Sequence, residues 1–559
     1  MSRLLLCTLN SKYIHTNLAV RILYQLNRHV RGLEWKEFTI KQDRGTIASF
    51  CSAYDVVAFS CYIWNITQTL EVCRLIKKLN PDTKILLGGP EVSYDYLDVI
   101  ARPEVDFIIP GEGETPFSEF ISVFPDVESV PGLVRKTGSG ICENAPSHSF
   151  DVKKLSAIMP YADDDPEELR KKVLYIETSR GCPYKCEFCL ASLDNKVRYL
   201  PDDVIKNTLM FMMKNGKVIK FLDRTFNIKR DFTIGIFEFI LEHHRPGNVF
   251  QFEITADILH PDIIRFINEK VPQGLFRFEI GIQTVNQQAN LAVSRKQNFE
   301  KTRTIILQLR DKVEMHIDLI VGLPNDRIND VRKSIEDVFA LHPPELQLGF
   351  LKFLKGTPVR EKHALSGYKF NPEPPYEIIS SDFLSVAELE QLRCLEHALE
   401  IYWNGGRARR TLRYVSTRHS VFEFLLGLGE KFRGRLPLIG YSLHDVYDLL
   451  LDFIIENYKD DRVLGELAVT DYYLHPGNTP QIRYTDVITA QTHTERTGAG
   501  TDACKIRRIT LPLSFNFGEM MSGNRLIPAD KPLTISYRMM PGSTVTGRQD
   551  CRILTDQPT

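Results

Sequence analysis

Short apolar segments and longer amphipathic segments alternate along the first 140 residues. Short apolar runs predict five β-strands, at residues 3–9, 35–40, 55–63, 83–88 and 106–109. Amphipathic stretches with apolar residues at helical spacing lie between these runs. This strand–helix alternation predicts a parallel sheet covered by helices on both faces, with a ligand crevice at the carboxyl ends of the strands.

A second alternating series begins at Lys172. It predicts six strands, at residues 173–178, 218–222, 250–255, 276–281, 314–321 and 345–351. Six βα repeats are enough to curl into an open barrel but fall short of the eight that close one. The active site is expected at the carboxyl ends of these strands.

These patterns predict an α/β protein that is divided into five parts. We expect a Rossmann-like parallel-sheet domain (1–140), a polar linker (141–170), a partial (β/α)6 barrel (171–360), a mostly helical domain (361–480) and a tail with short β-like runs (481–559). A chain of 559 residues is too long for one core, which agrees with several domains. The pattern assigns no role to the tail.

Composition narrows the class of protein. With 43% hydrophobic residues, 25% charged residues and a formal net charge of −1, the chain has no global field that would draw it onto nucleic acid or an anionic membrane. No apolar stretch reaches the ~20 residues that span a bilayer, and the first residues lack the features of a secretory signal. We therefore expect a cytoplasmic protein without a membrane partner. We expect the basic run at 405–413 to be a solvated helix face or loop, and contact with an anionic substrate such as an RNA backbone is the alternative.

Three of the eleven cysteines are clustered, and the other eight are expected to be small buried residues or incidental thiols. Cys182, Cys186 and Cys189 follow the first strand of the second series, which places three thiolates around one loop. Four-iron clusters are held by cysteine thiolates, usually four, so three ligands leave one iron open. The alternative is a structural zinc site, which would need a fourth ligand at a matching spacing.

This cysteine spacing, in the loop after the first strand of a six-fold βα series, resembles the radical S-adenosylmethionine (SAM) superfamily. The resemblance implies a [4Fe-4S] cluster held by the three cysteines, whose open iron binds SAM and whose electron cleaves it to a deoxyadenosyl radical. Matching positions in the cysteine loop and in or after the later strands imply further SAM-binding residues. These are Tyr184, Phe188, Asp223, Glu279, Gln283, Arg295 and Gly322.

The segments at 55–60, 86–91 and 106–114 resemble the cobalamin-binding domain of cobalamin-dependent radical enzymes. The implied cobalamin-binding residues are Tyr13, Asn17, Ser60, Tyr62, Trp64, Gly88, Gly89, Glu91, Gly111 and Glu112. The Asp-x-His-x-x-Gly motif of many cobalamin domains is missing, so we expect the lower face of the corrin to meet residues 62–65 or 13–17 and not a histidine ligand. A domain that binds another nucleotide is the alternative, although the chain lacks Gly-x-Gly-x-x-Gly after its first strand.

Together, these resemblances identify the chain as similar to cobalamin-dependent radical SAM enzymes that carry an uncharacterised helical carboxyl-terminal domain. They imply methyl transfer to an unactivated carbon of an unknown substrate, with an external one-electron reductant of the flavodoxin or ferredoxin type. A non-methylating rearrangement, cyclisation or redox step with the same cofactors is the first alternative. A non-catalytic iron–sulfur and cobalamin sensor or electron-transfer protein is the second.

Overall fold

The computed structural model describes residues 2–138, 140–475, 483–497, 504–523, 525–539 and 551–555. The expected helical domain and tail reach in part into stretches outside these described residues. The chain forms two compact units, which are treated separately below. The first unit contains residues 1–327 and 349–384, and the second contains residues 328–348 and 385–559.

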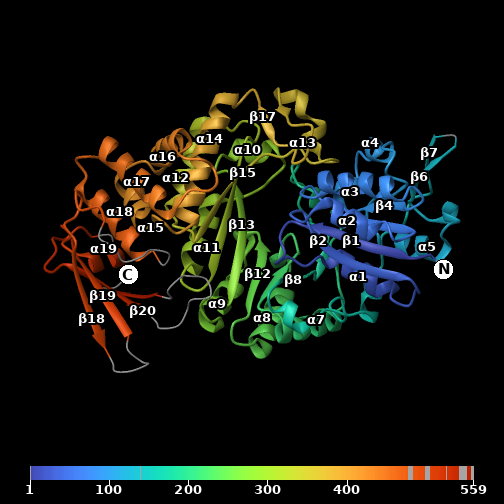
Figure 1. The fold of residues 1–559 in the computed structure, drawn as a ribbon, viewed down its shortest axis with the longest axis horizontal. Coiled ribbons are helices and arrows are strands. Elements are labelled where there is room, and N and C mark those ends of the chain that lie inside the picture. Colours follow the sequence, from blue (N-terminus) through green and yellow to red (C-terminus); the bar gives the residue numbers. More distant parts are fainter. Residues whose placement is uncertain are drawn as a thin grey trace. The chain divides into compact units, whose positions relative to one another are not determined.

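A seven-stranded sheet begins the first unit (Figure 1). Its strand order is β2-β1-β3-β4-β5-β6-β7. The first five strands are parallel, as expected: β1 (Leu4–Asn10), β2 (Leu33–Thr39), β3 (Val56–Ser60), β4 (Lys84–Gly88) and β5 (Phe107–Ile109). The structure adds two antiparallel strands, β6 (Val134–Thr137) and β7 (Gly140–Glu143), so the stretch at 141–170 that the sequence indicates as a linker begins within a hairpin.

Helices cover both faces of this sheet because its central strands β1 and β3 are buried along their whole length, and so on both sides. One face packs against α2 (Arg44–Cys51) and α3 (Ile66–Leu79) through a core that includes Leu5 and Val57. The other face packs against α1 (Leu18–Asn27) and α5 (Glu114–Val123) through a core that includes Leu6. Burial on both faces is what a parallel βα sheet requires.

The second sheet has six strands in the order β15-β14-β13-β12-β11-β8, which confirms the predicted open barrel. Its strands are β8 (Val173–Ile176), β11 (Val218–Phe221), β12 (Val249–Ile254), β13 (Phe276–Gln283), β14 (Glu314–Val321) and β15 (Glu345–Phe350). Helices α7 (Asp202–Asn215), α8 (Arg230–His243), α9 (Pro261–Lys270) and α11 (Phe299–Leu309) connect consecutive strands.

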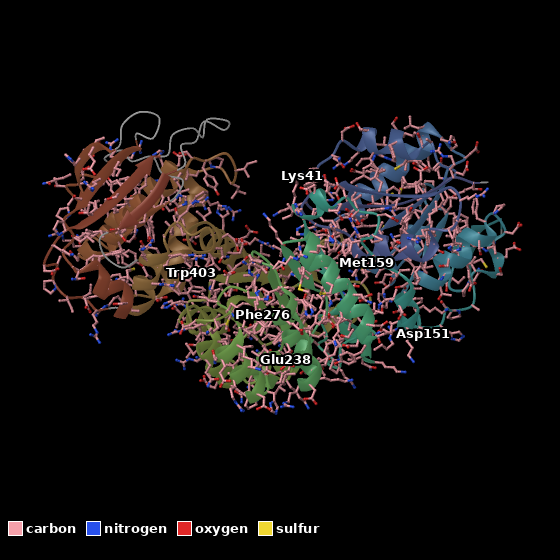
Figure 2. The ribbon with its side chains drawn as sticks, turned by 90° about the horizontal axis from the view of Figure 1, so that it is seen from below. Lys41, Asp151, Met159, Glu238, Phe276 and Trp403 are labelled. Atoms are coloured by element: carbon pink, nitrogen blue, oxygen red, sulfur yellow. The ribbon has the colours of Figure 1, made fainter. Side chains whose placement is uncertain are left out.

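The two faces of the barrel strands differ in polarity. In β13, Phe276 and Phe278 are buried and pack with Phe237 of α8, and Figure 2 labels Phe276 within this aromatic core. The alternate residues, such as Glu279, are only half buried and face the opposite side. Because side chains alternate along a strand, the concave face of the open barrel is polar.

The loop between β1 and α1 pairs with the first barrel strand. His15 forms a parallel bridge with Val173 at the start of β8, and the Val173 amide donates to Ile14 at 2.7 Å. The free edge of β8 is therefore paired at its first residue with backbone from the amino-terminal domain. This contact brings the β1–α1 loop to the inside of the first unit, next to the barrel.

The second unit is mostly helical, as expected, and ends in an antiparallel sheet. Its helices are α12 (Ile328–Phe339), α14 (Val386–Ala398), α15 (Arg409–Arg418), α16 (Val421–Arg435), α17 (Leu443–Asn457), α18 (Arg462–Leu474) and α19 (Phe517–Gly523). Its sheet contains β18 (Gln491–Thr497), β19 (Cys504–Leu511), β20 (Leu533–Met539) and β21 (Cys551–Thr555). Helix α12, expected in the barrel, belongs to this unit, where Arg332 pairs with Glu423 of α16 at 2.6 Å.

Candidate functional site

The three clustered cysteines lie in the loop that follows β8 and the two-residue strand β9 (Ser179–Arg180). All three are free thiols, with Cys182 and Cys186 buried and Cys189 half buried. Gly181, which precedes them, has φ +90°, and an added Cβ would lie 2.5 Å from the Lys196 carbonyl oxygen. The tight turn that presents the cysteines therefore requires glycine.

Polar contacts fix this cysteine loop from several sides. The Cys182 amide donates to the Asp194 carbonyl at 2.8 Å, and the Cys189 amide donates to the Cys186 carbonyl at 3.1 Å. Glu187 accepts from Lys362 and from Ser294, each at 2.9 Å. The loop is therefore held by Asp194, by Ser294 from between β13 and β14, and by Lys362 from after β15. These contacts keep its thiols in place before any metal binds.

The electrostatics of the loop suit thiolate ligands. Burial raises the pKa of the Cys182 and Cys186 thiols, while the Arg295 guanidinium, 3.7 Å from Cys186 Sγ, acts in the opposite direction on Cys186. Metal binding deprotonates such thiols. Within the described residues, no three His, Cys, Asp or Glu side chains converge on a single-ion site. Ligands of a four-iron cluster need not converge, because each binds a different iron, so the three cysteines fit such a cluster.

Two of the expected SAM-binding residues are polar and half buried at the barrel: Arg295 contacts the cysteine loop, and Glu279 lies on the concave face of β13. Arg295 donates to the Gly281 carbonyl as well as to Cys186. Glu279 accepts from Lys220 at 2.6 Å and from Gln251. Both side chains already have protein partners, and both remain partly exposed to the barrel interior.

Asp223 and Gly322, also expected to bind SAM, occupy packed positions. Asp223 is 2% exposed and accepts from the Thr178 amide at 3.0 Å, the Thr178 hydroxyl at 2.7 Å and the Ser179 hydroxyl at 2.5 Å. An added Cβ at Gly322 would lie 2.7 Å from Ile378 Cδ1. These contacts point to roles in holding the strand ends.

Buried acceptors without a partner lie at the ends of β12 and β13. They are Oε1 of Gln283 and Oδ1 of Asp257, a residue that the sequence did not single out. Gln283 has φ +68° at a bulge, which turns the backbone at the strand end. Such orphaned acceptors call for donors, and SAM offers hydroxyl and ammonium donors. Tyr184 and Phe188 are half buried within the cysteine loop.

A cavity of about 780 Å³ lies at the carboxyl ends of β1, β3, β4 and β5. Barrel residues next to the cysteine loop complete its wall, among them Glu177, Arg180 and Asp194. Apolar side chains supply a large part of this wall. The apolar lining comes from Leu6, Leu18, Ala19, Ile22, Leu23, Ala58, Leu86 and Phe117.

Eight of the ten expected cobalamin-binding residues line this cavity. They are Asn17, Ser60, Tyr62, Trp64, Gly88, Gly89, Gly111 and Glu112. The other two, Tyr13 and Glu91, are not among the lining residues: Tyr13 is 54% exposed and donates to Glu168, and Glu91 is buried and accepts from Tyr376. Nothing lies within 4 Å of a Cβ built on Gly111, which leaves the cavity open to a large flat ligand there.

The cavity wall is rigid around Tyr62. Buried Asn65 accepts from the Tyr62 amide at 2.7 Å and donates to the Leu9 and Ser60 carbonyls. The Tyr62 ring stacks on Trp64, with centroids 4.3 Å apart and planes 9° apart, and Trp64 is 46% exposed. Two aromatic faces are therefore presented at the mouth, where they can pack on a flat macrocycle.

Charged residues that the sequence did not single out join the cavity to the cysteine loop. Arg180, two residues before Cys182, pairs with Glu112 at 3.0 Å, Glu114 at 2.6 Å and Glu177 at 2.7 Å. Arg198 pairs with the same Glu112 at 2.8 Å. No sequence spacing signals the pairs with Glu112 and Glu114, because these two partners lie in the amino-terminal domain, whereas Glu177 lies three residues before Arg180.

The basic run at 405–413 has structural partners within the second unit. Arg407 donates to the Ile401 carbonyl, Arg409 to the Trp403 carbonyl and Arg410 to buried Asp471. These contacts favour the structural interpretation of the run over contact with RNA. Among the described residues, none of the helices combines the length and hydropathy needed to span a bilayer.

An open βα barrel with three cysteines after its first strand, beside a parallel-sheet domain with a cofactor-sized cavity, is the architecture that the sequence led us to expect of a radical enzyme with a second cofactor domain. Comparison with family models agrees with this architecture. Residues 6–121 match the B12 binding domain, residues 176–338 match the Radical SAM superfamily, and residues 365–499 match a family of unknown function, DUF4080. The chain thus carries the domain combination of cobalamin-dependent radical SAM enzymes, which confirms the resemblance found in the sequence.

Two curated proteins are similar to parts of this chain. The chain is 36% identical over 149 residues to the 2-(S-pantetheinyl)-carbapenam-3-carboxylate methyltransferase of Streptantibioticus cattleyicolor. This alignment covers 24% of the chain and 22% of that protein. The chain is also 25% identical over 348 residues to the cobalamin-dependent radical SAM methyltransferase TokK of Streptomyces tokunonensis. This alignment covers 57% of the chain and 50% of that protein. The chain therefore spans half or less of the length of these two relatives.

Solved structures share the fold at low identity. The cobalamin-dependent SAM radical enzyme OxsB, with aqua-cobalamin bound, aligns with a TM-score of 0.59 at 15% identity over 84% of this chain and 80% of that chain. The radical SAM methyltransferase TsrM from Kitasatospora setae aligns with a TM-score of 0.55 at 15% identity over 67% and 79%. These alignments confirm the fold class predicted from the sequence.

Proposed function

We propose that the chain is a cobalamin-dependent radical SAM methyltransferase that acts on an unactivated carbon of a substrate still to be identified. The observation that carries this proposal is the cavity of about 780 Å³, whose wall combines the carboxyl ends of the amino-terminal strands with residues that flank the cysteine loop. A cofactor in this cavity would contact both domains at once. The two curated relatives described above are named as methyltransferases, which supports the same reaction.

Each group of residues has a part in this proposal. Cys182, Cys186 and Cys189 hold the cluster, and Arg295 offsets the negative charge at Cys186. The unpartnered acceptors on Gln283 and Asp257 receive donors from SAM. When bound, the cofactors supply a substrate-activating radical and a transferable methyl group, and the protein supplies alignment and a cavity that limits water.

The concave face of the barrel provides contacts for a polar substrate. Glu253 lies directly opposite Glu279 on the neighbouring strand, and its nearest cation, Arg224, is 3.8 Å away. Burial raises the pKa of Glu253, and the Glu279 charge acts in the same direction. His316 and Asp318 on β14 are 3.1 Å apart on the same face. A substrate with hydrogen-bond donors would find acceptors here.

An external one-electron reductant completes the proposal, because the chemistry needs an electron that the substrate does not provide. A flavodoxin or ferredoxin type fits this requirement. A cytoplasmic location belongs to the same proposal, since a reducing compartment keeps thiols available for a cluster.

The test uses the full chain, reconstituted without oxygen with iron, sulfide and cobalamin, and supplied with a chemical reductant and SAM labelled on its methyl group. We expect 5′-deoxyadenosine to form, and we expect the label to enter a small molecule or macromolecule of a cell extract. Deoxyadenosine without label transfer would support the non-methylating alternative instead. Absence of deoxyadenosine from a protein with intact cluster and cobalamin spectra would support the sensor alternative.

Substitution of the cluster cysteines checks the same proposal residue by residue. Cys182→Ala removes one of three thiolates, so we expect the broad visible absorption of the cluster and the formation of deoxyadenosine both to be lost. Cys142→Ala, a half-buried thiol in the amino-terminal domain, is the matched control and should change neither. Full cluster content in Cys182→Ala would contradict the assignment.

A further inference from the structure

The β1–α1 loop places one imidazole in the cavity wall. Among the residues that line the cavity, His15 is the only histidine. Its backbone is fixed on two sides, by the bridge to Val173 and by Asn10, whose side-chain amide donates to the His15 carbonyl at 2.9 Å. The histidine therefore has a defined position at the boundary between the cavity and the barrel.

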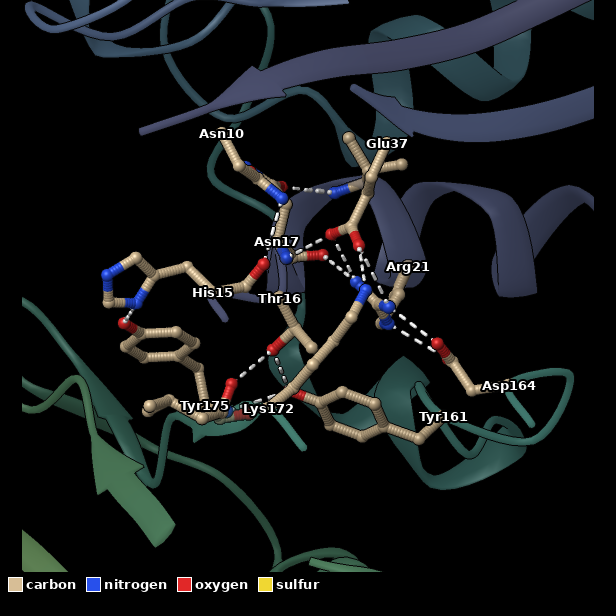
Figure 3. Close-up of polar contacts among 12 residues, drawn as sticks. Asn10, His15, Thr16, Asn17, Arg21, Glu37, Tyr161, Asp164, Lys172 and Tyr175 are labelled. Carbon is tan, nitrogen blue, oxygen red and sulfur yellow. Dashed lines mark hydrogen bonds and ion pairs between the residues drawn. The ribbon is translucent and has the colours of Figure 1, made fainter. Parts of the chain in front are cut away.

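A barrel residue orients this imidazole (Figure 3). His15 Nδ1 lies 2.7 Å from the hydroxyl of Tyr175, a residue of β8 that also lines the cavity. No described residue contacts Nε2 within hydrogen-bond distance, so this nitrogen is available for another partner.

This arrangement matches the way proteins hold metal-binding histidines. One ring nitrogen bonds a fixed polar group, which sets the tautomer and the ring plane, and the other nitrogen meets the metal. Tyr175 is itself fixed, because its amide donates to the Tyr161 hydroxyl at 2.8 Å and the same hydroxyl donates to the Tyr175 carbonyl at 2.8 Å. Tyr161 thus fixes Tyr175, and Tyr175 in turn orients His15, as a neighbouring polar group orients a metal-binding histidine.

The shape of the cavity adds a second argument. Its inner part is an apolar slot between the sheet and α1, where Leu6, Ala58 and Ile22 supply part of the wall. An apolar slot of this kind suits the aromatic benzimidazole base at the end of the cobalamin tail. With its own base in the slot, cobalt would have an open axial position, and His15 is the histidine that can fill it.

We propose that His15 coordinates the cobalt of bound cobalamin through Nε2 and that Tyr175 is the positioning residue that orients it. The sequence led us to expect a site without a histidine ligand, because the Asp-x-His-x-x-Gly motif is missing. His15 meets the geometric need by a different route, with a tyrosine from the barrel in place of a neighbouring carboxylate. The proposal rests on cobalamin binding and not on methyl transfer.

Electron paramagnetic resonance of the cobalamin-loaded full chain, reduced to the cobalt(II) state, tests the coordination directly. One axial nitrogen splits each cobalt line into three, whereas a ¹⁵N ligand gives two. We expect three-line splitting in the unlabelled protein and two-line splitting after growth with ¹⁵N-histidine. Splitting that labelling leaves unchanged would identify the base of cobalamin as the ligand, and absence of nitrogen splitting would also overturn the proposal.

Substitutions then identify the residue. His15→Gln should bind cobalamin without nitrogen splitting, whereas His29→Gln, which changes the other histidine of this domain, should retain the wild-type spectrum. Tyr175→Phe should keep the ¹⁵N-sensitive splitting with a changed coupling, because the ring loses its orienting hydroxyl. Unchanged splitting in His15→Gln would refute the proposal. If His15→Gln does not fold, a Tyr175→Phe spectrum identical to wild type would refute it.

Discussion

Burial and hydrogen bonding act in opposite directions on the Asp223 carboxyl group. Burial raises its pKa from the ordinary value of 3.8 to about 6, while the Ser179 and Thr178 donors partly offset this rise. The carboxyl group therefore binds its proton more tightly in the folded chain than in the unfolded chain. Its contribution to stability is complete below about pH 4 and declines as the pH rises through about 6.

The pH dependence of stability tests this behaviour. Between pH 5 and pH 7, the wild-type protein should lose roughly 1 kcal/mol of unfolding free energy through Asp223 alone. Asp223→Asn cannot ionise, so its melting temperature should fall less over the same interval. The difference between the two pH profiles isolates this group, and parallel profiles would contradict the raised pKa.

At the scale of the elements, the turn before Cys182 depends on close backbone contact. Gly181 and Gly247 have nearly the same backbone conformation, with φ +90° and φ +89°. They differ in space: a Cβ at Gly181 would meet the Lys196 carbonyl, whereas nothing lies within 4 Å of one at Gly247. The two positions therefore separate the cost of the conformation from the cost of the clash.

Gly181→Ala and Gly247→Ala form a matched pair. Each should cost about 1–2 kcal/mol for the left-handed conformation. Gly181→Ala should additionally displace the cysteine loop, so its iron content after reconstitution should fall well below that of Gly247→Ala. Equal iron contents would show that the loop tolerates the added methyl group.

The sequence predicted the parallel strands to within a few residues, because each is a short apolar run bounded by turns. It missed the β6–β7 hairpin, whose only strongly apolar residues are Val134 and Ile141, so its edge strands resemble a polar linker. Residues of the site were predicted where a local motif marks them, as in the cysteine loop. Asp257 and the His15–Tyr175 pair were missed, because their roles depend on contacts between segments that lie far apart in the sequence.

At the scale of the whole molecule, ion pairs link the amino-terminal domain to the barrel within the first unit. Arg180 joins the rim of the cavity to the segment just before Cys182. Arg21 is 1% exposed and pairs with Glu37 at 2.6 Å and with Asp164, from the segment before the barrel, at 2.5 Å (Figure 3). Both arginines are enclosed by carboxylates, so removing either leaves buried negative charge.

Arg180→Gln should loosen the cavity rim without removing a cluster ligand. Glu112 would keep its pair with Arg198, whereas Glu114 and Glu177 would lose the Arg180 cation. We expect cobalamin affinity to fall about 10- to 100-fold while deoxyadenosine still forms. Arg230→Gln, which breaks a surface pair with Asp262, should leave affinity unchanged. Wild-type cobalamin affinity in Arg180→Gln would show that Arg180 does not support cobalamin binding.

Arg21→Met tests the second link. Two carboxylates lose their buried cation, so we expect a cost of about 3–5 kcal/mol and a lower melting temperature. The triple variant Arg21→Met, Glu37→Gln, Asp164→Asn should recover part of the loss, because it removes the stranded charges as well. If the triple variant were no more stable than the single one, packing of Arg21 and not its charge would explain the loss.

The bridge between His15 and Val173 has a consequence for dividing this chain in the laboratory. A barrel produced from residue 171 onward would present β8 as a bare edge, and unpaired strand edges recruit other chains. Such a fragment should aggregate or dimerise through this edge. Fusion of a different cofactor domain in front of the barrel would not prevent this unless that domain paired a loop of its own with β8. The two domains are therefore joined as one folding unit and are not interchangeable modules.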